Sequence, residues 1–187
     1  MLRKLSSLVL FFTIILSGSI TQASSADSQQ KLDELANKLK ETGQDAVLVA
    51  EVTRQNGQGL AMSTINSRDQ KWQATSGMDG FMKELMSNAG AKRLAAIEKE
   101  YGVIVESFLM DNKGANVSMT NKTSDYWQGD EAKFIKSFNG GKGAVHMGEA
   151  KFDKSAQAYV VQISVPVISG DRAIGAITYS VNMDDLK

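Results

Sequence analysis

Two adjacent aromatic residues, Tyr126 and Trp127, stand in an otherwise polar stretch of the sequence. The three residues before them are Thr-Ser-Asp, and the three after them are Gln-Gly-Asp. Their side chains combine apolar area with a hydrogen-bonding tip, as small-molecule pockets require. Both are therefore candidate ligand-binding residues. The alternative is that one of the two rings closes the hydrophobic core under the loop.

Lys133 is a candidate for binding an anionic ligand. It lies in the first turns of a helix that the pattern predicts over residues 129–138, and the amino end of a helix is itself a weak anion site. The alternative is a solvated lysine paired with Asp130 or Glu131, which would contribute little to stability.

His146 and Tyr159 lie in predicted strands and complete the candidate set. His146 is the only histidine and stands between Val145 and Met147, so alternation places it on the opposite face of the sheet from them. Its charge would respond near neutral pH if that face forms a pocket, and otherwise it is a structural or surface residue. Tyr159 begins a strand on the same face as the apolar residues that alternate after it, which makes it core or pocket lining.

The composition removes most catalytic and metal-dependent chemistry. The chain has no cysteine and one histidine, so it lacks a thiol nucleophile and the cysteine ligands of zinc and iron–sulfur sites. A Ser-His-Asp triad would have to use the single histidine of the chain. The acidic residues Asp125, Asp130 and Glu131 do not follow the spacing of a calcium-binding EF-hand loop. We expect no catalytic residue, metal or cofactor, and a hydrolytic enzyme is the least supported class.

Length and charge narrow the class of protein further. The chain has 187 residues, of which 42% are hydrophobic and 22% charged, a composition typical of one globular domain. The 21 basic residues balance the 21 acidic ones, which removes the strongest reason to propose nucleic-acid binding.

Residues 1–23 have the features of a secretory signal peptide. Arg3 and Lys4 precede an apolar run over residues 8–16, and small residues suit cleavage after Ala23 or Ala26. The alternative is an uncleaved membrane anchor. A span takes roughly 20 consecutive apolar residues, whereas residues 5–20 include four serines and a glycine. We therefore expect a cleaved signal peptide and a periplasmic protein.

The hydrophobic period changes near residue 102, within what we expect to be one domain. Residues 24–102 show helical spacing, with Asp45 and Asp79 as candidate N-caps. Residues 103–187 show two-fold alternation, with strands predicted over 103–110, 115–120, 143–152, 159–167 and 173–181. Short turns between successive strands require antiparallel pairing. The predicted fold is α+β, an antiparallel sheet of about five strands with the N-terminal helices packed on one face.

Three motifs in the second half resemble those of a known family. Residues 108–117 hold a strand that ends in Asp-Asn-Lys-Gly before a second strand begins. Residues 124–134 run Ser-Asp-Tyr-Trp-Gln-Gly-Asp-Glu-Ala-Lys-Phe, and residues 165–177 combine Val-Pro-Val-Ile with Gly-Ala-Ile after a turn. Their order and spacing resemble the Cache (PDC) family of PAS-like extracytoplasmic sensor domains. The likeness covers about residues 103–182.

The resemblance implies a non-catalytic sensor that binds a small polar metabolite, such as a carboxylate or an amino acid. Lys133 stands where the family has an arginine, so any carboxylate would meet a point charge and not a bidentate fork. The sequence ends a few residues after the last predicted strand. We therefore expect signalling through a partner, a membrane-bound sensor kinase or a chemoreceptor, and the family also allows a homodimer through the N-terminal helices. The alternative function is a ligand-free accessory protein of the cell envelope.

Overall fold

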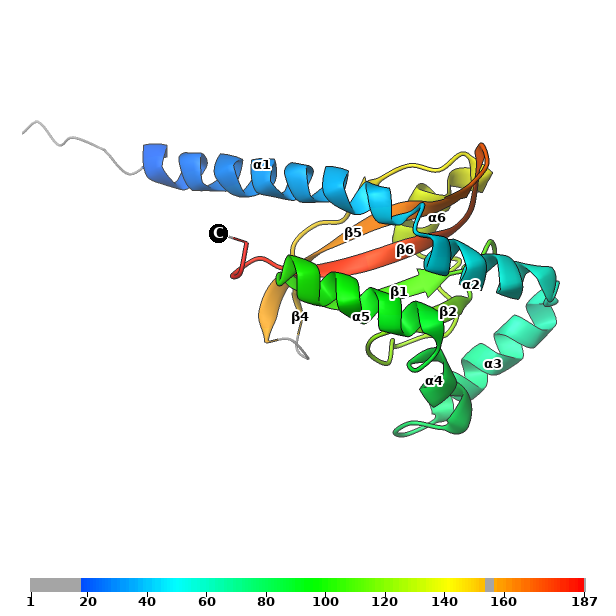
Figure 1. Cartoon of the computed structure of the whole chain (residues 1–187). Coiled ribbons are helices and arrows are strands. Elements are labelled where there is room, and N and C mark those ends of the chain that lie inside the picture. The colour runs from blue at the N-terminus through cyan, green and yellow to red at the C-terminus, as the bar shows by residue number, and fades with distance from the viewer. Residues whose placement is uncertain (1–17, 154–156, 187) are drawn as a thin grey trace, which may run out of the picture.

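The computed structural model describes residues 18–153 and 157–186 (Figure 1). Most of the expected signal peptide, residues 1–17, lies outside the described residues, and its last part belongs to the first helix. Within the described ranges, none of the helices has both the length and the hydropathy needed to span a bilayer.

Five helices precede the sheet, and polar caps mark where several of them begin. They are α1 (Gly18–Thr42), α2 (Ala46–Gly57), α3 (Met62–Ala74), α4 (Gly80–Leu85) and α5 (Ala89–Tyr101). Carboxylate oxygens of Asp45 and Asp79 accept hydrogen bonds from the first free amides of α2 and α4, as the sequence predicts, and Asn88 caps α5 in the same way. Gly102, at φ 70°, ends α5 in the left-handed conformation.

The second half forms one antiparallel sheet. Its strands are β1 (Ile104–Met110), β2 (Asn116–Met119), β3 (His146–Met147), β4 (Lys151–Asp153), β5 (Ala158–Ser169) and β6 (Arg172–Asn182). The spatial order is β2-β1-β6-β5-β3, and β4 also pairs with β5. The long strands β5 and β6 lie at the centre, where alternating apolar residues are buried on both sides. This arrangement confirms the predicted α+β class.

One face of the sheet is covered by α1, α2 and α5 (Figure 1). Leu39, Leu48 and Leu94, one from each helix, are fully buried against sheet residues such as Ile163 and Ile177. Removing such side chains from water supplies most of the stability of a domain of this size. The N-terminal helices and the sheet therefore share one hydrophobic core.

The helices α3 and α4 pack elsewhere. Together with α6 (Ala132–Phe138), they contribute to a second cluster that includes Phe108 and Met110 of β1. In this cluster Trp72 of α3, Phe81 of α4 and Tyr126 of the loop before α6 form an aromatic group, with ring centroids 5.4–6.3 Å apart. Three of the five N-terminal helices therefore cover one face of the sheet, while α3 and α4 lie beside β2 and the loop that follows it.

Two elements differ from the sequence prediction. The single strand expected over residues 143–152 is two short strands, because the pairing register with β5 steps by one residue between β3 and β4. The described sheet therefore has six strands and not five. The helix expected from residue 129 begins at Ala132, because the amide of Gln128 is bonded to the carbonyl of Gly114 at 2.8 Å and holds the preceding chain against the β1–β2 turn.

Candidate functional site

The face of the sheet opposite α1 carries a row of polar side chains set by strand register. Ser180 of β6 is paired with Glu106 of β1 on one side and with Gln162 of β5 on the other. The Ser180 hydroxyl donates to a Glu106 carboxylate oxygen at 3.4 Å, and the Gln162 amide donates to Ser180 at 3.5 Å. These long hydrogen bonds link side chains from three neighbouring strands into one polar surface on the sheet, called the polar floor below.

A second row lies next to the first. It runs from Phe108 of β1 through Thr178 of β6 and Ser164 of β5 to His146 of β3. The hydroxyls of Ser164 and Thr178 are fully buried and bond to each other at 2.9 Å. Because these two groups satisfy one another and Phe108 is buried, His146 is the member of the row that remains available to a ligand.

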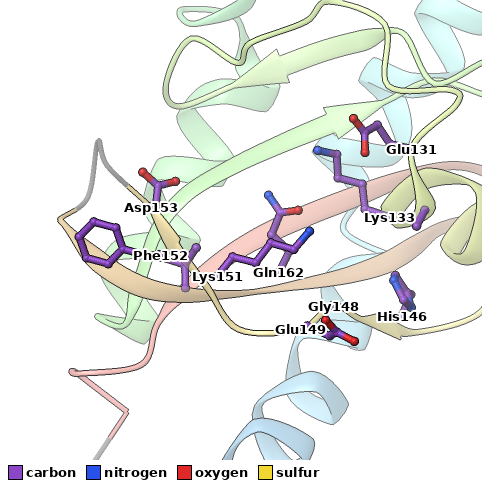
Figure 2. A pocket seen from close by; sticks show the side chains of 11 residues that line it. Glu131, Lys133, His146, Gly148, Glu149, Lys151, Phe152, Asp153 and Gln162 are labelled. Carbon is purple, nitrogen blue, oxygen red and sulfur yellow. The ribbon is translucent and has the colours of Figure 1, made fainter.

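A first cavity of about 340 Å³ lies over this floor, between α6 and the β3–β4 segment (Figure 2). In Figure 2, Lys133 lies at the end near α6 and Asp153 at the end near β4, with Gln162 between them. The side chain of Val160 adds apolar lining, while the ring of Phe152 is turned toward Tyr159. The cavity therefore has the mixed lining that small-molecule sites need.

A second cavity of about 280 Å³ adjoins the first and shares Lys133, Asp153 and Gln162 with it. Glu106 lines this second cavity, together with Phe108 and residues of the loop between β2 and α6. Those loop residues are Lys122, Thr123, Ser124 and Gln128. The two cavities meet at the shared side chains, so one ligand can reach groups in both.

Lys133 is held by an aromatic ring. Its ammonium lies 5.4 Å from the centre of the Phe108 ring, and within residues 18–153 and 157–186 it forms no ion pair. A cation above an aromatic face is attracted by the ring, and the attraction is modest at a partly exposed site. The positive charge is therefore positioned at the junction of the cavities without being neutralised by a carboxylate.

Glu106 is an acid in an unfavourable place for a negative charge. Burial raises the pKa of its carboxyl, and the nearby carboxylate of Asp153 raises that pKa further. The Ser180 hydroxyl and the Lys133 ammonium oppose part of this rise. A cationic group placed near Glu106 would reverse the balance and favour the ionised form.

His146 lies on the cavity side of β3, while the neighbouring Met147 packs against the helix-covered core. Burial lowers the pKa of the imidazole, and the positive charge of Lys136 lowers it further. The ring is therefore held toward its neutral form, in which it has one donor and one acceptor.

The three aromatic candidates lie outside both cavities. Tyr126 is fully buried among Trp72 and Phe81. Its hydroxyl has no hydrogen-bonding partner in the described structure, and Arg68 lies close enough only to offset part of the rise in pKa that burial causes.

The side chains of Trp127 and Tyr159 also contact parts of the protein outside the cavities. The indole of Trp127 donates to the carbonyl of Lys113 at 2.7 Å and pins the loop to the β1–β2 turn. Tyr159 is 56% exposed and lies edge-on against Phe152, with ring centroids 5.5 Å apart. Of the five residues that the sequence singled out, Lys133 and His146 line the cavity and the others do not.

The cavity residues that were not singled out from the sequence include Glu106, Gln162 and Asp153. Glu106 had a detectable signal, because it is the one charged residue in a strand that is apolar apart from Ser107. Gln162 had a similar signal, a polar amide in the middle of the most regular alternation in the chain. Asp153 had none, because an acidic residue in a turn is ordinarily solvated.

In the part of the chain that the structure describes, no group of three or more histidine, aspartate or glutamate side chains is arranged to hold a metal ion. The side chains that line the two cavities supply the ammonium groups of Lys122, Lys133 and Lys151, an imidazole, amides, hydroxyls and carboxylates. Such a set can bind and orient a small polar molecule through charge and hydrogen bonds.

Comparison with known proteins returned structures but no sequence relatives. No family model and no curated protein matches the sequence. The structure is similar to the sensor domain of the V. cholerae histidine kinase DctB, with a TM-score of 0.42 and 8% identity over 90% of this chain and 58% of that one.

Two further solved structures belong to ligand-binding domains. The sensory domain of the Campylobacter jejuni chemoreceptor Tlp3 with isoleucine bound gives a TM-score of 0.41 and 12% identity over 86% of this chain and 64% of that one. The ligand-binding domain of Mlp24 with asparagine gives 0.35 and 17%, over 89% of this chain and 62% of that one. The chain thus spans less than two thirds of each of these domains. Sensor domains are the class of protein that the sequence motifs resemble.

Proposed function

We propose that this protein is a non-catalytic, periplasmic sensor of the single-Cache type that binds a small zwitterion, an amino acid or a closely similar amino-carboxylate. The proposal rests on one observation. Lys133 and Glu106 carry opposite charges and line the same cavity. A ligand with a carboxylate and an ammonium would complement both, whereas a simple dicarboxylate would bring a second negative charge to Glu106.

The sizes and lining of the cavities support a ligand of this class. The volume of the first cavity, about 340 Å³, falls at the lower end of the range for small-molecule sites, and the adjoining cavity adds about 280 Å³. In this proposal the ligand carboxylate meets Lys133, the ammonium meets Glu106, and His146 and Gln162 add hydrogen bonds. The apolar side chain of Val160 would contact the remainder of the ligand.

Signalling would pass to a second protein. A binding event changes the surface of a domain only if the ligand has different affinities for two of its states. The loop between β2 and α6 lines the second cavity and also reaches the surface, with Ser124 exposed. We propose that ligand binding orders this loop and that a membrane-bound sensor kinase or chemoreceptor recognises the result.

Thermal unfolding against a panel of the twenty L-amino acids, their amides and simple dicarboxylates tests the proposal. A compound at about 100 times its Kd should add about 2.7 kcal/mol, which raises the midpoint by several degrees. We expect stabilisation by amino acids and little by dicarboxylates or by amino-acid amides, which lack the carboxylate.

Two variants localise any effect. Glu106→Gln and Lys133→Met each remove one charge and keep the volume of the side chain. We expect each to reduce the stabilisation by amino acids to about half or less in a protein that still folds. A flat panel with the wild-type protein would instead favour the ligand-free accessory role.

A further inference from the structure

The helix α3 is fastened to the loop that lines the second cavity. One carboxylate oxygen of Asp69, in the middle of α3, accepts two hydrogen bonds from successive backbone amides of that loop. The donors are the amides of Tyr126, at 2.8 Å, and of Trp127, at 3.0 Å. Hydrogen bonds to a charged acceptor are stronger than neutral ones. Asp69 thus holds two consecutive peptide units in one orientation.

Other bonds surround this contact. The second carboxylate oxygen of Asp69 accepts from the amide of Gln73 at 2.8 Å, and the same amide donates to Asp125 of the loop at 2.8 Å. The indole of Trp72 donates to the carbonyl of Thr123, also at 2.8 Å. One face of α3 therefore contacts the loop at residues 123, 125, 126 and 127.

The loop carries cavity residues immediately beside these contacts. Thr123 and Gln128 line the second cavity and are 7% and 1% exposed. On the side away from α3, two hydrogen bonds that do not involve Asp69 join the loop to the β1–β2 hairpin, so they form only when the loop is in place. The amide of Asn116 donates to the carbonyl of Tyr126 at 2.9 Å, and the amide of Gln128 donates to the carbonyl of Gly114 at 2.8 Å.

We propose that Asp69 is a positioning residue for the ligand site: it holds the loop in the geometry that closes the second cavity, and it thereby couples ligand binding to α3. This inference rests on the proposed function for its ligand and on the contacts above for its mechanism. By thermodynamic reciprocity, an amino acid that binds more tightly when the loop is held also tightens the contact between the loop and α3.

The first measurement needs no ligand. Amide hydrogen exchange is compared between the wild type and Asp69→Ala, read at the amides of Asn116 and Gln128. Neither amide bonds to Asp69, so loss of the acceptor alone leaves them protected. We expect both to exchange at least about tenfold faster in the variant, because the loop is no longer held. Unchanged protection at both positions would overturn the proposal.

The second measurement uses an equimolar mixture of the twenty L-amino acids as the probe. We expect the rise in thermal midpoint produced by the mixture to be reduced or lost in Asp69→Ala, in line with a roughly 5- to 150-fold fall in affinity. A purely structural role would lower the midpoint without the mixture and leave the rise intact, which would also overturn the proposal.

Three further variants serve as controls. Asp69→Asn keeps a side-chain oxygen for the two amides, so we expect it to retain most of the rise and to provide a folded test if the alanine variant is unstable. Gln73→Ala removes only the lateral link and should show a smaller effect. Asp33→Asn changes an exposed aspartate on α1, bonded to Gln29, and should behave as the wild type.

The two measurements separate the possible failures. If the mixture does not stabilise the wild type, the proposed function fails, while hydrogen exchange still decides whether Asp69 holds the loop. The two tryptophans of the chain, Trp72 and Trp127, both lie at this contact. A change in intrinsic fluorescence on addition of the mixture, present in the wild type and absent in Asp69→Ala, is therefore the expected spectroscopic signature.

Discussion

The ammonium of Lys133 lies above the ring of Phe108, 5.4 Å from its centre, at the point where two cavities join. Lys133 belongs to α6 and Phe108 to β1, so the contact is made across the site and not within one element. An aromatic ring steadies a cation without neutralising it. The geometry therefore leaves the charge available to a carboxylate, which a salt bridge would not.

The first prediction concerns that charge. Lys133→Met keeps the apolar stem of the side chain and removes the ammonium, so a bound carboxylate loses a charge-assisted hydrogen bond. Such a bond is worth about 1.5–3 kcal/mol, and the affinity for amino acids should fall roughly 10- to 100-fold. Isothermal titration calorimetry measures the change.

Lys136→Met is the matched control. Lys136 lies on the same short helix but is exposed and lines neither cavity. Because Lys136 also lowers the pKa of His146, the comparison is made at about pH 8, where the imidazole is neutral in both proteins. There we expect the affinity of the variant for amino acids to equal that of the wild type. An equal loss of affinity in both variants would mean that the effect comes from the helix and not from the position of Lys133.

The second prediction concerns the stability of the protein without ligand. The pKa of Glu106 is raised in the folded protein. The contribution of this carboxyl to the free energy of unfolding is therefore fully present below its pKa in the unfolded chain. It is lost as the pH rises through its pKa in the folded protein. Glu106→Gln removes the charge that burial and Asp153 disfavour. The variant should unfold at a higher temperature than the wild type near neutral pH, by roughly 2–4 °C for each 1 kcal/mol gained.

The pH dependence supplies the control for this prediction. Near pH 3.5, where Glu106 is protonated in both folded and unfolded protein, the two midpoints should converge. Lys133 and Glu98 also act on Glu106, and both remain in the variant, so the comparison isolates one carboxyl. A glutamine variant that is less stable at every pH would contradict the raised pKa.

The third prediction concerns His146. Its pKa is lowered by burial and by Lys136, so the unfolded chain binds the proton more readily than the folded one. Stability should therefore fall as the pH drops from about 7.5 through the unfolded pKa near 6.5. His146→Gln removes the group that takes up this proton, so the thermal unfolding midpoint of the variant should fall less over the same pH interval than that of the wild type. Thermal unfolding at a series of pH values gives the comparison.

The fourth prediction separates structural aromatic residues from cavity residues. Trp127→Phe removes the hydrogen bond to the carbonyl of Lys113, which costs about 1 kcal/mol. Because the indole lines neither cavity and Asp69 still binds the backbone amide of residue 127, we expect the affinity for amino acids to stay within about twofold of the wild type. Urea unfolding and calorimetry measure the two quantities. A large loss of affinity with unchanged stability would place Trp127 in the site.

The fifth prediction concerns the link between α1 and α2. A Cβ atom at Gly43 would collide with the backbone carbonyl of Pro166, and the amide of Ile168 donates to the carbonyl of Gly43 at 2.8 Å. Gly43→Ala must push the link away from β5 and should destabilise the protein by roughly 1–3 kcal/mol. Chemical unfolding with a constant m-value would confirm this.

Gly57→Ala is the control for the steric argument. Gly57 ends α2, and a Cβ atom there would have no neighbour within 4 Å. The substitution should be neutral or stabilising by up to about 1 kcal/mol, since alanine favours a helix. Equal destabilisation by both changes would indicate that chain stiffness, and not the contact with Pro166, matters at Gly43.

Local pattern was enough to predict most of the elements. The caps Asp45 and Asp79 stand where the sequence places them, and the alternation through β5 is buried as expected. Such features depend on neighbours a few residues apart, so the sequence states them directly. The expected strand over residues 143–152 was wrong in one respect, because a one-residue step in register, which no periodicity records, divides it into β3 and β4.

The site depended on contacts between distant segments. Lys133 and His146 were predicted from residue type, and both line the first cavity. Glu106 and Gln162 join them only because each pairs with Ser180 across the sheet. Tyr126 had the residue type of a ligand-binding aromatic, yet the packing of α3 and α4 encloses it.

The sequence by itself determined the class of fold and excluded thiol and multi-histidine chemistry, because hydrophobic period and composition are properties of the chain. Only the tertiary structure decided which charges share a cavity and which helix holds its loop. The reason is physical. Strand register and the packing of α3 bring together residues from Asp69 to Gln162, and the cost or gain of each charge depends on the neighbours and the burial that it meets there.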